Sequence, residues 1–167
     1  MQLTHDQNKF QQKTFPITIV CDAITSPANV GGIFRAADAF GAEKVIFCGS
    51  LLPDFGKRMQ KTSRSTEKYV PFEFSETILT TLESLKEDGY KLLALEITEN
   101  STPLQQLQLS KTDKIAIIIG AERLGVSEEV LNLADVISHI EMFGNNSSMN
   151  VAQALTVALY QVTKCIS

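Results

Sequence analysis

The sequence has few of the residues on which metal and hydrolase chemistry depend. Its 167 residues include two histidines, His5 and His139, and three cysteines, Cys21, Cys48 and Cys165, with no CxxC spacing. Two histidines are too few for a His-rich metal centre and make a Ser-His-Asp triad hard to build. An odd number of widely separated cysteines favours reduced, buried thiols over disulfides. We therefore expect no metal, and chemistry that uses other groups.

Long apolar segments are absent as well. No apolar run approaches the roughly 18 residues that a membrane span requires, and the N-terminal stretch MQLTHDQNKFQQKTF is polar and lacks the apolar core of a secretion signal. A chain of 167 residues suits one domain. We expect a single domain over residues 1–167, with residues 1–14 as a polar N-terminal extension, in a cytoplasmic protein without a membrane partner.

The common nucleotide-binding motifs are also missing. No strand is followed by GxGxxG, and the stretch from Gly49 to Lys57 (GSLLPDFGK) has a six-residue spacer where a P-loop needs four, with no Ser or Thr after the lysine. These absences disfavour a P-loop NTPase and a Rossmann dehydrogenase. They also weaken the alternative of an α/β protein that binds a small phosphate compound.

What the sequence does contain is an alternation of apolar runs and amphipathic segments. We expect buried strands at 17–21, 44–48, 90–97, 114–120 and 136–140, and a weaker edge strand at 69–74, where Pro71 cannot donate to a sheet. Helices are expected at 32–40, 75–88, 127–133 and 149–164. This pattern predicts an α/β fold with a mostly parallel open sheet and helices on both faces. The last helix has an apolar stripe that suits either the core or a partner subunit.

The basic residues are unevenly distributed. A formal net charge of −4 argues mildly against a nucleic-acid partner, because phosphates bind lysine and arginine. A third of the basic residues nevertheless form one basic cluster: Lys57, Arg58, Lys61, Arg64 and Lys68. Steps of four, three and four would place four of them on one helical face. The cluster is therefore either a solvated face or a phosphate-binding one.

Three loops that follow expected strands are rich in Gly, Asn and Ser. They are SPANVGGIFR at 26–35, GAERLG at 120–125 and EMFGNNSSMN at 141–150. Ligands of open α/β sheets bind at such loops, beyond the carboxyl ends of the strands. Glycine allows close backbone approach to a ligand, while Asn and Ser supply donors and acceptors.

These segments, in order and spacing, resemble the three motifs of the SpoU (TrmH-type) branch of the SPOUT RNA methyltransferases. The resemblance lies in NVGGIFRAADAFGAEKVIFCG (29–49), IAIIIGAERLGV (115–126) and SMNVAQALTVALYQV (148–162), and extends to KTSRSTEKYVPF (61–72). Glu141 and Ala121 depart from the family pattern, which has Pro and Ser or Asn there. The resemblance implies a C-terminal deep trefoil knot, S-adenosylmethionine as cofactor and a homodimer through the last helix.

The resemblance also assigns roles to residues. It implies catalytic roles for Arg35, Asn29, Glu122, Ser148 and Asn150, and cofactor binding by Leu95, Gly120, Ile140, Met142, Ser148 and Met149. Arg35 would contact RNA phosphate together with the basic cluster. Each role has a plainer alternative: an ion pair of Arg35 with Asp38, helix caps at Asn29 and Ser148, an exposed loop acid at Glu122, and apolar core residues.

The function implied is methylation of a ribose 2′-hydroxyl in RNA. Transfer RNA is the favoured substrate, because it is the commonest target of small family members that lack an added RNA-binding domain. Ribosomal RNA is the alternative within the same activity. A non-catalytic module that binds RNA and cofactor is the alternative from another class, although a pure binder need not retain all five polar site residues.

Overall fold

The computed structural model describes residues 10–51 and 53–167, so most of the expected N-terminal extension, residues 1–9, lies outside the described residues. Within the described residues, seven strands form one open sheet in the order β3-β2-β1-β6-β4-β7-β5, and every pairing is parallel. The strands are β1 (Phe15–Asp22), β2 (Ala42–Cys48), β3 (Phe72–Ser75), β4 (Tyr90–Leu95), β5 (Thr102–Pro103), β6 (Lys114–Gly120) and β7 (Val136–His139). The predicted α/β fold with a parallel open sheet is confirmed.

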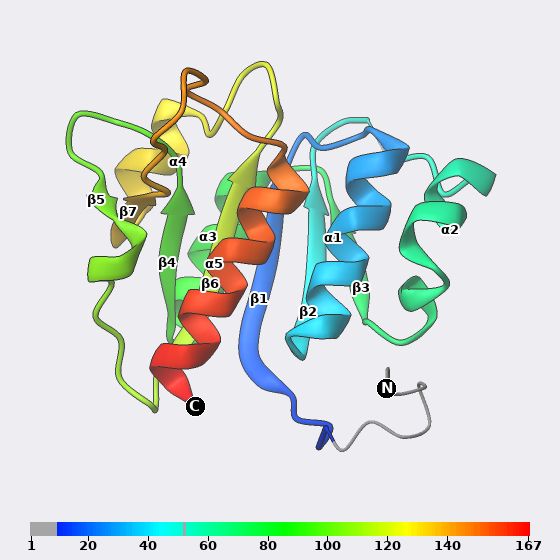
Figure 1. Cartoon of the computed structure of the whole chain (residues 1–167), viewed down its shortest axis with the longest axis horizontal. Coiled ribbons are helices and arrows are strands. Elements are labelled where there is room, and N and C mark those ends of the chain that lie inside the picture. The colour runs from blue at the N-terminus through cyan, green and yellow to red at the C-terminus, as the bar shows by residue number, and fades with distance from the viewer. Residues whose placement is uncertain (1–9, 52) are drawn as a thin grey trace.

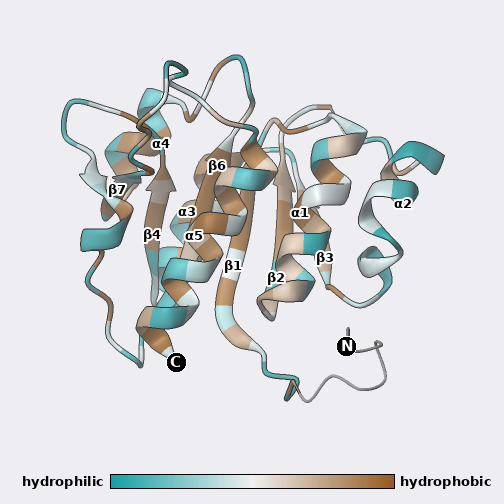
Figure 2. Ribbon diagram, viewed as in Figure 1, coloured by the Kyte–Doolittle hydropathy of each residue, from teal (hydrophilic) through white to brown (hydrophobic). Residues whose placement is uncertain are grey.

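Helices cover both faces of the sheet, as expected (Figure 1). The helices are α1 (Pro27–Ala39), α2 (Lys57–Ser63), α3 (Ile78–Glu87), α4 (Glu128–Leu133) and α5 (Val151–Ile166), with 3-10 turns η2 (Thr66–Lys68) and η3 (Leu104–Gln106). One apolar cluster joins α1, α2 and α5 to the sheet, and a second joins α3 and α4 to the opposite face. Figure 2 shows the central strands β1, β2, β4 and β6 as largely hydrophobic, in keeping with their cover of helices on both sides.

The central strands hold the core together. In β1, Ile17, Ile19 and Cys21 face one cluster and Val20 faces the other, as the two-residue period of a strand requires. Residues 115–119 of β6 are all at most 1% exposed. Burying one such isoleucine stabilises the fold by about 1.5–3 kcal/mol. The near-continuous apolar runs of the sequence arise from this burial on both faces.

Helix starts differ from the sequence prediction. α3 begins at Ile78 rather than Ser75, with Thr77 as its N-cap. α1 starts at Pro27 rather than Gly32, with Ser26 as its N-cap, because proline suits the first helical position. α5 starts at Val151 rather than Met149, and its N-cap is Asn150. The alternatives that placed helix caps at Asn29 and Ser148 are therefore wrong.

The glycine pair of α1 sets the spacing of three helices. A Cβ on Gly31 would lie 2.7 Å from the Met59 carbonyl oxygen in α2, and a Cβ on Gly32 would lie 2.8 Å from the Ala152 Cβ in α5. α1 is thus closely packed between α2 and α5. Placing the start of α5 against the second turn of α1 brings the third loop next to the first.

The expectation of one helical face for the basic cluster is wrong. α2 ends at Ser63, because Arg64 and Ser65 adopt left-handed conformations with φ of 54° and 68°. Lys68 therefore belongs to η2 instead of a continued α2. All five basic side chains are nevertheless exposed. Among the described residues, no helix has the length and apolar character to cross a membrane.

Candidate functional site

A pocket lies where the carboxyl ends of β4, β6 and β7 meet the start of α5. Its volume is about 460 Å³. Because all strands are parallel, the loops that follow them gather at one edge, at the top of Figure 1. The lining residues are Leu95, Glu96, Ile97, Ile119, Gly120, Ala121, Glu122, Gly125, His139, Ile140, Met142, Ser147, Ser148, Met149, Asn150, Val151 and Ala154.

Asn150 joins the three loops at one point. Its Nδ2 donates to Asn29 Oδ1 at 2.8 Å and to Glu122 Oε1 at 3.1 Å. Its Oδ1 accepts from the backbone N–H groups of Ala152 at 3.0 Å and Gln153 at 3.3 Å. Since Asn150 uses all the polar atoms of its amide, the cap of α5 also fixes Asn29 and Glu122. Segments 121 and 28 residues away along the chain thus converge on one side chain.

The loop after β6 is a tight turn built from glycines. A Cβ on Gly120 would lie 2.1 Å from the Gly125 carbonyl carbon, so only glycine fits there. Gly125 has a φ of 64°, and its N–H donates to the Ala121 carbonyl oxygen at 2.8 Å. The turn holds Glu122 at its exposed tip, where Asn150 reaches it.

Glu96 fastens this turn to the neighbouring strand and was not anticipated from the sequence. Its Oε2 accepts from the Val126 N–H at 2.9 Å, its Oε1 accepts from the Ile97 N–H at 2.9 Å, and its own N–H donates to the Ser138 carbonyl oxygen at 3.0 Å. The ends of β4, β6 and β7 are therefore joined through one residue. The sequence feature that could have identified Glu96 is an acidic residue directly after an apolar strand.

His139 lines the pocket, and Glu141 lies between the lining residues Ile140 and Met142. His139, at the end of β7, places its Nδ1 2.9 Å from Ser101 Oγ, which fixes the orientation of the ring. Glu141, the departure from the family pattern, accepts a hydrogen bond from Gln105 Nε2. That bond anchors the start of the 141–150 loop to η3.

Burial controls the charge states near the strand ends. Desolvation raises the pKa of Asp22, which follows β1, and a hydrogen bond from the Ser127 backbone partly offsets the rise. Desolvation raises the pKa of the Cys48 thiol to about 11 and that of Cys21 well above its ordinary value. All three cysteines are free; Cys21 and Cys48 are buried as predicted, whereas Cys165 is half-buried. Neither buried thiol is a competent nucleophile.

The structure brings most of the predicted site residues together. All the residues predicted to bind cofactor line the pocket: Leu95, Gly120, Ile140, Met142, Ser148 and Met149. Glu122, Ser148 and Asn150 line it too, and the buried Asn29 reaches it through Asn150.

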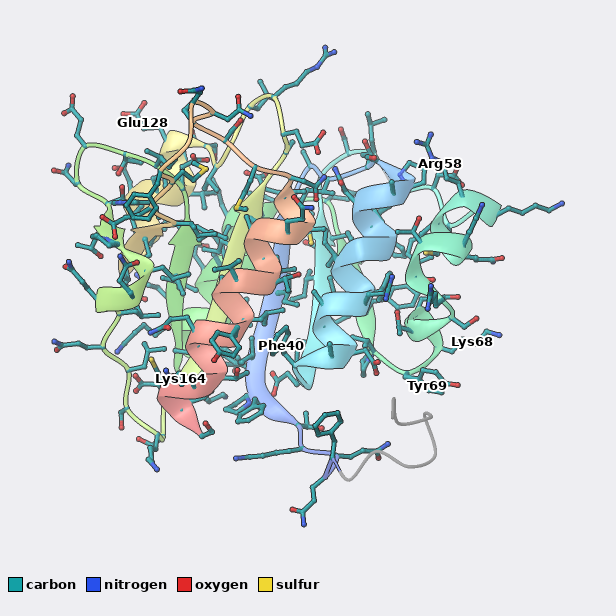
Figure 3. The ribbon with its side chains drawn as sticks, viewed as in Figure 1. Phe40, Arg58, Lys68, Tyr69, Glu128 and Lys164 are labelled. Carbon is teal, nitrogen blue, oxygen red and sulfur yellow. The ribbon has the colours of Figure 1, made fainter. Side chains whose placement is uncertain are left out.

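Arg35 stands apart from this group, nearly two turns after Asn29 on α1. Its side chain is exposed and, within the described part of the chain, forms no ion pair with Asp38 or any other acid. The basic cluster lies beyond α1, on the α2 side of the molecule, where Figure 3 labels Arg58 and Lys68. Both groups are free to meet an external anion.

Comparisons with known proteins agree on one family. The model of the SpoU rRNA Methylase family matches residues 16–160. A Staphylococcus saprophyticus protein named for the TrmH family of tRNA/rRNA methyltransferases is 30% identical over 156 residues, which cover 93% of this chain and 61% of that protein. The chain thus spans less than two thirds of that relative.

Solved structures show the same fold. The AdoMet-bound rRNA methyltransferase from Sinorhizobium meliloti has a TM-score of 0.83 at 20% identity and covers 95% of this chain and 59% of its own. A structure concerned with the 2-OH methylation of C/U34 on tRNA has a TM-score of 0.79 at 22% identity and covers 91% of this chain and 98% of its own. From the family match and the shared fold, the chain belongs to the SpoU rRNA methylase family.

Proposed function

We propose that this chain is an S-adenosylmethionine-dependent RNA methyltransferase that methylates a ribose 2′-hydroxyl, in tRNA by preference. The convergence of Asn29, Glu122 and Asn150 at the rim of a 460 Å³ pocket carries this proposal. The tRNA preference is supported by a full-length fold match to a structure concerned with tRNA methylation.

The pocket residues fit the cofactor. A volume of about 460 Å³ lies within the range of about 300–1,000 Å³ typical of small-molecule sites. Leu95, Ile140, Met142 and Met149 offer apolar surface for a flat base, while Gly120, which lines the pocket without a side chain, offers main-chain groups to the ligand. When bound, S-adenosylmethionine would supply a methyl group on a positively charged sulfur.

The polar residues would orient the RNA ribose. Asn150 holds Glu122 and Asn29 in fixed positions, so their remaining lone pairs are available to a hydroxyl at the pocket rim. Arg35 would bind the adjacent phosphate. A guanidinium is a poor base, so the contribution of Arg35 is positioning and charge stabilisation, with the phosphate assisting loss of the hydroxyl proton.

Assembly would complete the RNA surface. We propose a homodimer through α5, supported by the exposed surface of Val157 and Tyr160, which are 40% and 59% exposed on this helix. A dimer would let the basic cluster of one subunit contact RNA bound at the other. Sedimentation of wild type and Tyr160→Glu tests this, since a charge in the interface should yield monomers.

Three further features belong to the proposal. We propose one domain over residues 1–167, a C-terminal trefoil knot and a cytoplasmic location. The knot is supported by the path of the chain, which leaves β7 near one sheet edge and returns in α5 to pack against α1. Joining the termini covalently and comparing electrophoretic mobility after denaturation with an unknotted ring of equal length tests it.

Methyl transfer provides the decisive test. The purified chain is incubated with methyl-labelled cofactor and either tRNA or rRNA, and nuclease digests are searched for labelled 2′-O-methyl nucleosides. Arg35→Ala should lower turnover by at least about 10²-fold while cofactor still binds. Lys111→Ala, which removes an exposed cation before β6, serves as control. Near-normal turnover of the Arg35 variant contradicts its assignment, and cofactor binding without transfer by wild type favours the non-catalytic module.

A further inference from the structure

Phenylalanine rings form a rigid stack that reaches the surface at the β3 edge of the sheet. Phe55 stacks on Phe72 with ring centroids 5.2 Å apart, and Phe74 lies 5.6 Å from Phe72 and 6.1 Å from Phe47. Phe34 anchors the stack in the core and is fully buried. Phe72 and Phe74, in contrast, are 38% and 45% exposed. Their open ring surface is therefore held in place from behind.

The two faces of β3 differ in charge, because successive side chains of a strand point to opposite faces. Glu73, between the two exposed rings, points to the opposite face and pairs with Lys44 Nζ at 3.0 Å. The face of the rings is thus left without that carboxylate. Among the described strands, β3 pairs with β2 alone, so its outer side is open.

Cations flank the rings on both sides along the chain. Phe55 is followed by Lys57 and Arg58 at the start of α2, and Phe72 is preceded by Lys68 and Tyr69. Tyr69 is 75% exposed, and Figure 3 places it beside Lys68 on the same side of the molecule as Arg58.

The nearby acids are already engaged. Asp54 Oδ1 accepts from the Gly56 N–H at 2.8 Å, and Glu67 accepts from the Ser63 hydroxyl. Five exposed cations therefore outweigh two occupied acids over residues 54–70. An anionic partner with flat, apolar groups complements such a surface.

We propose that Lys57, Arg58, Lys68, Tyr69, Phe72 and Phe74 form a surface that binds unpaired nucleotides of the RNA, here called the edge surface. The cations contact phosphates, and the exposed rings stack on bases. In a duplex the base faces are hidden against one another, so stacking selects a loop or a single-stranded end. The inference deepens the proposed function and rests on RNA being the substrate.

The test measures RNA binding without cofactor, so that it does not depend on methyl transfer. Fluorescence anisotropy compares a labelled single-stranded RNA oligonucleotide with a duplex of the same sequence. Wild type should prefer the single strand. Tyr69→Ala should weaken single-strand binding about tenfold, as loss of one stacked base does, with little change in salt dependence, whereas Tyr69→Phe keeps the ring and should bind like wild type.

A cation variant separates stacking from charge. Lys57→Gln should weaken both RNAs and reduce the slope of log Kd against log salt by roughly 0.7 on the single strand. Equal binding of both RNAs with no effect of Tyr69→Ala would overturn the proposal. The proposal would also be overturned if Tyr69→Ala left RNA binding unchanged but altered the oligomeric state in sedimentation. The edge surface would then contact a second copy of the chain. If RNA binding depends on Tyr69 but the protein transfers no methyl group, the proposed edge surface is supported and the proposed enzymatic function is contradicted.

Discussion

Removing the Glu96 carboxylate should loosen the loop that carries Glu122. In Glu96→Ala, the N–H groups of Val126 and Ile97 both lose an ionised acceptor. A hydrogen bond to a charged group contributes about 1.5–3 kcal/mol. Ile97 is 53% exposed, so water can replace its partner, whereas Val126 is 6% exposed and its N–H is left unsatisfied. The hydrogen bond from Val126 therefore decides the size of the effect, and we expect the free energy of unfolding to fall by about 2 kcal/mol.

Urea unfolding measures the stability of this variant, and calorimetry measures binding of S-adenosylmethionine. Glu96→Gln keeps an oxygen for Val126 and should stay within about 1 kcal/mol of wild type. Glu99→Ala removes an exposed carboxylate from the same connection and should change neither quantity. The cofactor affinity of Glu96→Ala should fall together with its stability. A Glu96→Ala protein as stable as the Glu99→Ala control, with unaltered cofactor affinity, would refute this role of Glu96.

Two other perturbations test the strand ends. Gly120→Ala would place a Cβ 2.1 Å from the Gly125 carbonyl carbon, so it should destabilise the fold by about 1–3 kcal/mol and abolish cofactor binding. Gly144→Ala is the control and should be neutral, because a Cβ there would have nothing within 4 Å. Equal melting temperatures of the two variants would contradict this prediction. Because burial raises the pKa of Asp22, the folded state holds its proton more tightly than the unfolded state, so ionisation of Asp22 opposes folding as pH rises above 3.8. Asp22→Asn keeps an acceptor for Ser127 and should stabilise the protein at pH 7, with the gain vanishing below about pH 4 in unfolding experiments run across pH.

The elements that were predicted well are those with strong periodicity. The runs at 17–21 and 114–120 gave β1 and β6 because residues buried on both faces have no polar alternation to obscure them. The edge strand predicted at 69–74 is confirmed as β3, which lies at one edge of the sheet and starts just after Pro71. β5 was missed because two residues, one of them proline, have no periodicity.

Helix boundaries were harder to predict than helices. The sequence predicts α1 from Gly32 on, but residues 27–31 of the helix include only one large apolar side chain, Val30, so apolar periodicity does not mark its start. α2 ends because Arg64 adopts a left-handed conformation, which is uncommon for arginine and cannot be predicted from its presence in the sequence.

The site divides in the same way. The pocket residues followed from motif resemblance, and the loops were found from their position after strands. The connections between them were not predictable, because hydrogen bonds such as Asn150 to Asn29 link residues 121 positions apart. Glu96 was overlooked because its function is to bind backbone, and no motif marks a carboxylate that binds backbone N–H groups.

The position of Asn150 at the cap of the final helix has a consequence for synthesis of the protein. Asn29 leaves the ribosome early, yet the side chain that holds it emerges 121 residues later, and α5 can pack on α1 only after that. A nascent chain, or one cut short before this helix, has all seven described strands but no assembled centre. The hydrogen bonds among the three loops should therefore form in a single step, once α5 has been made and has packed on α1.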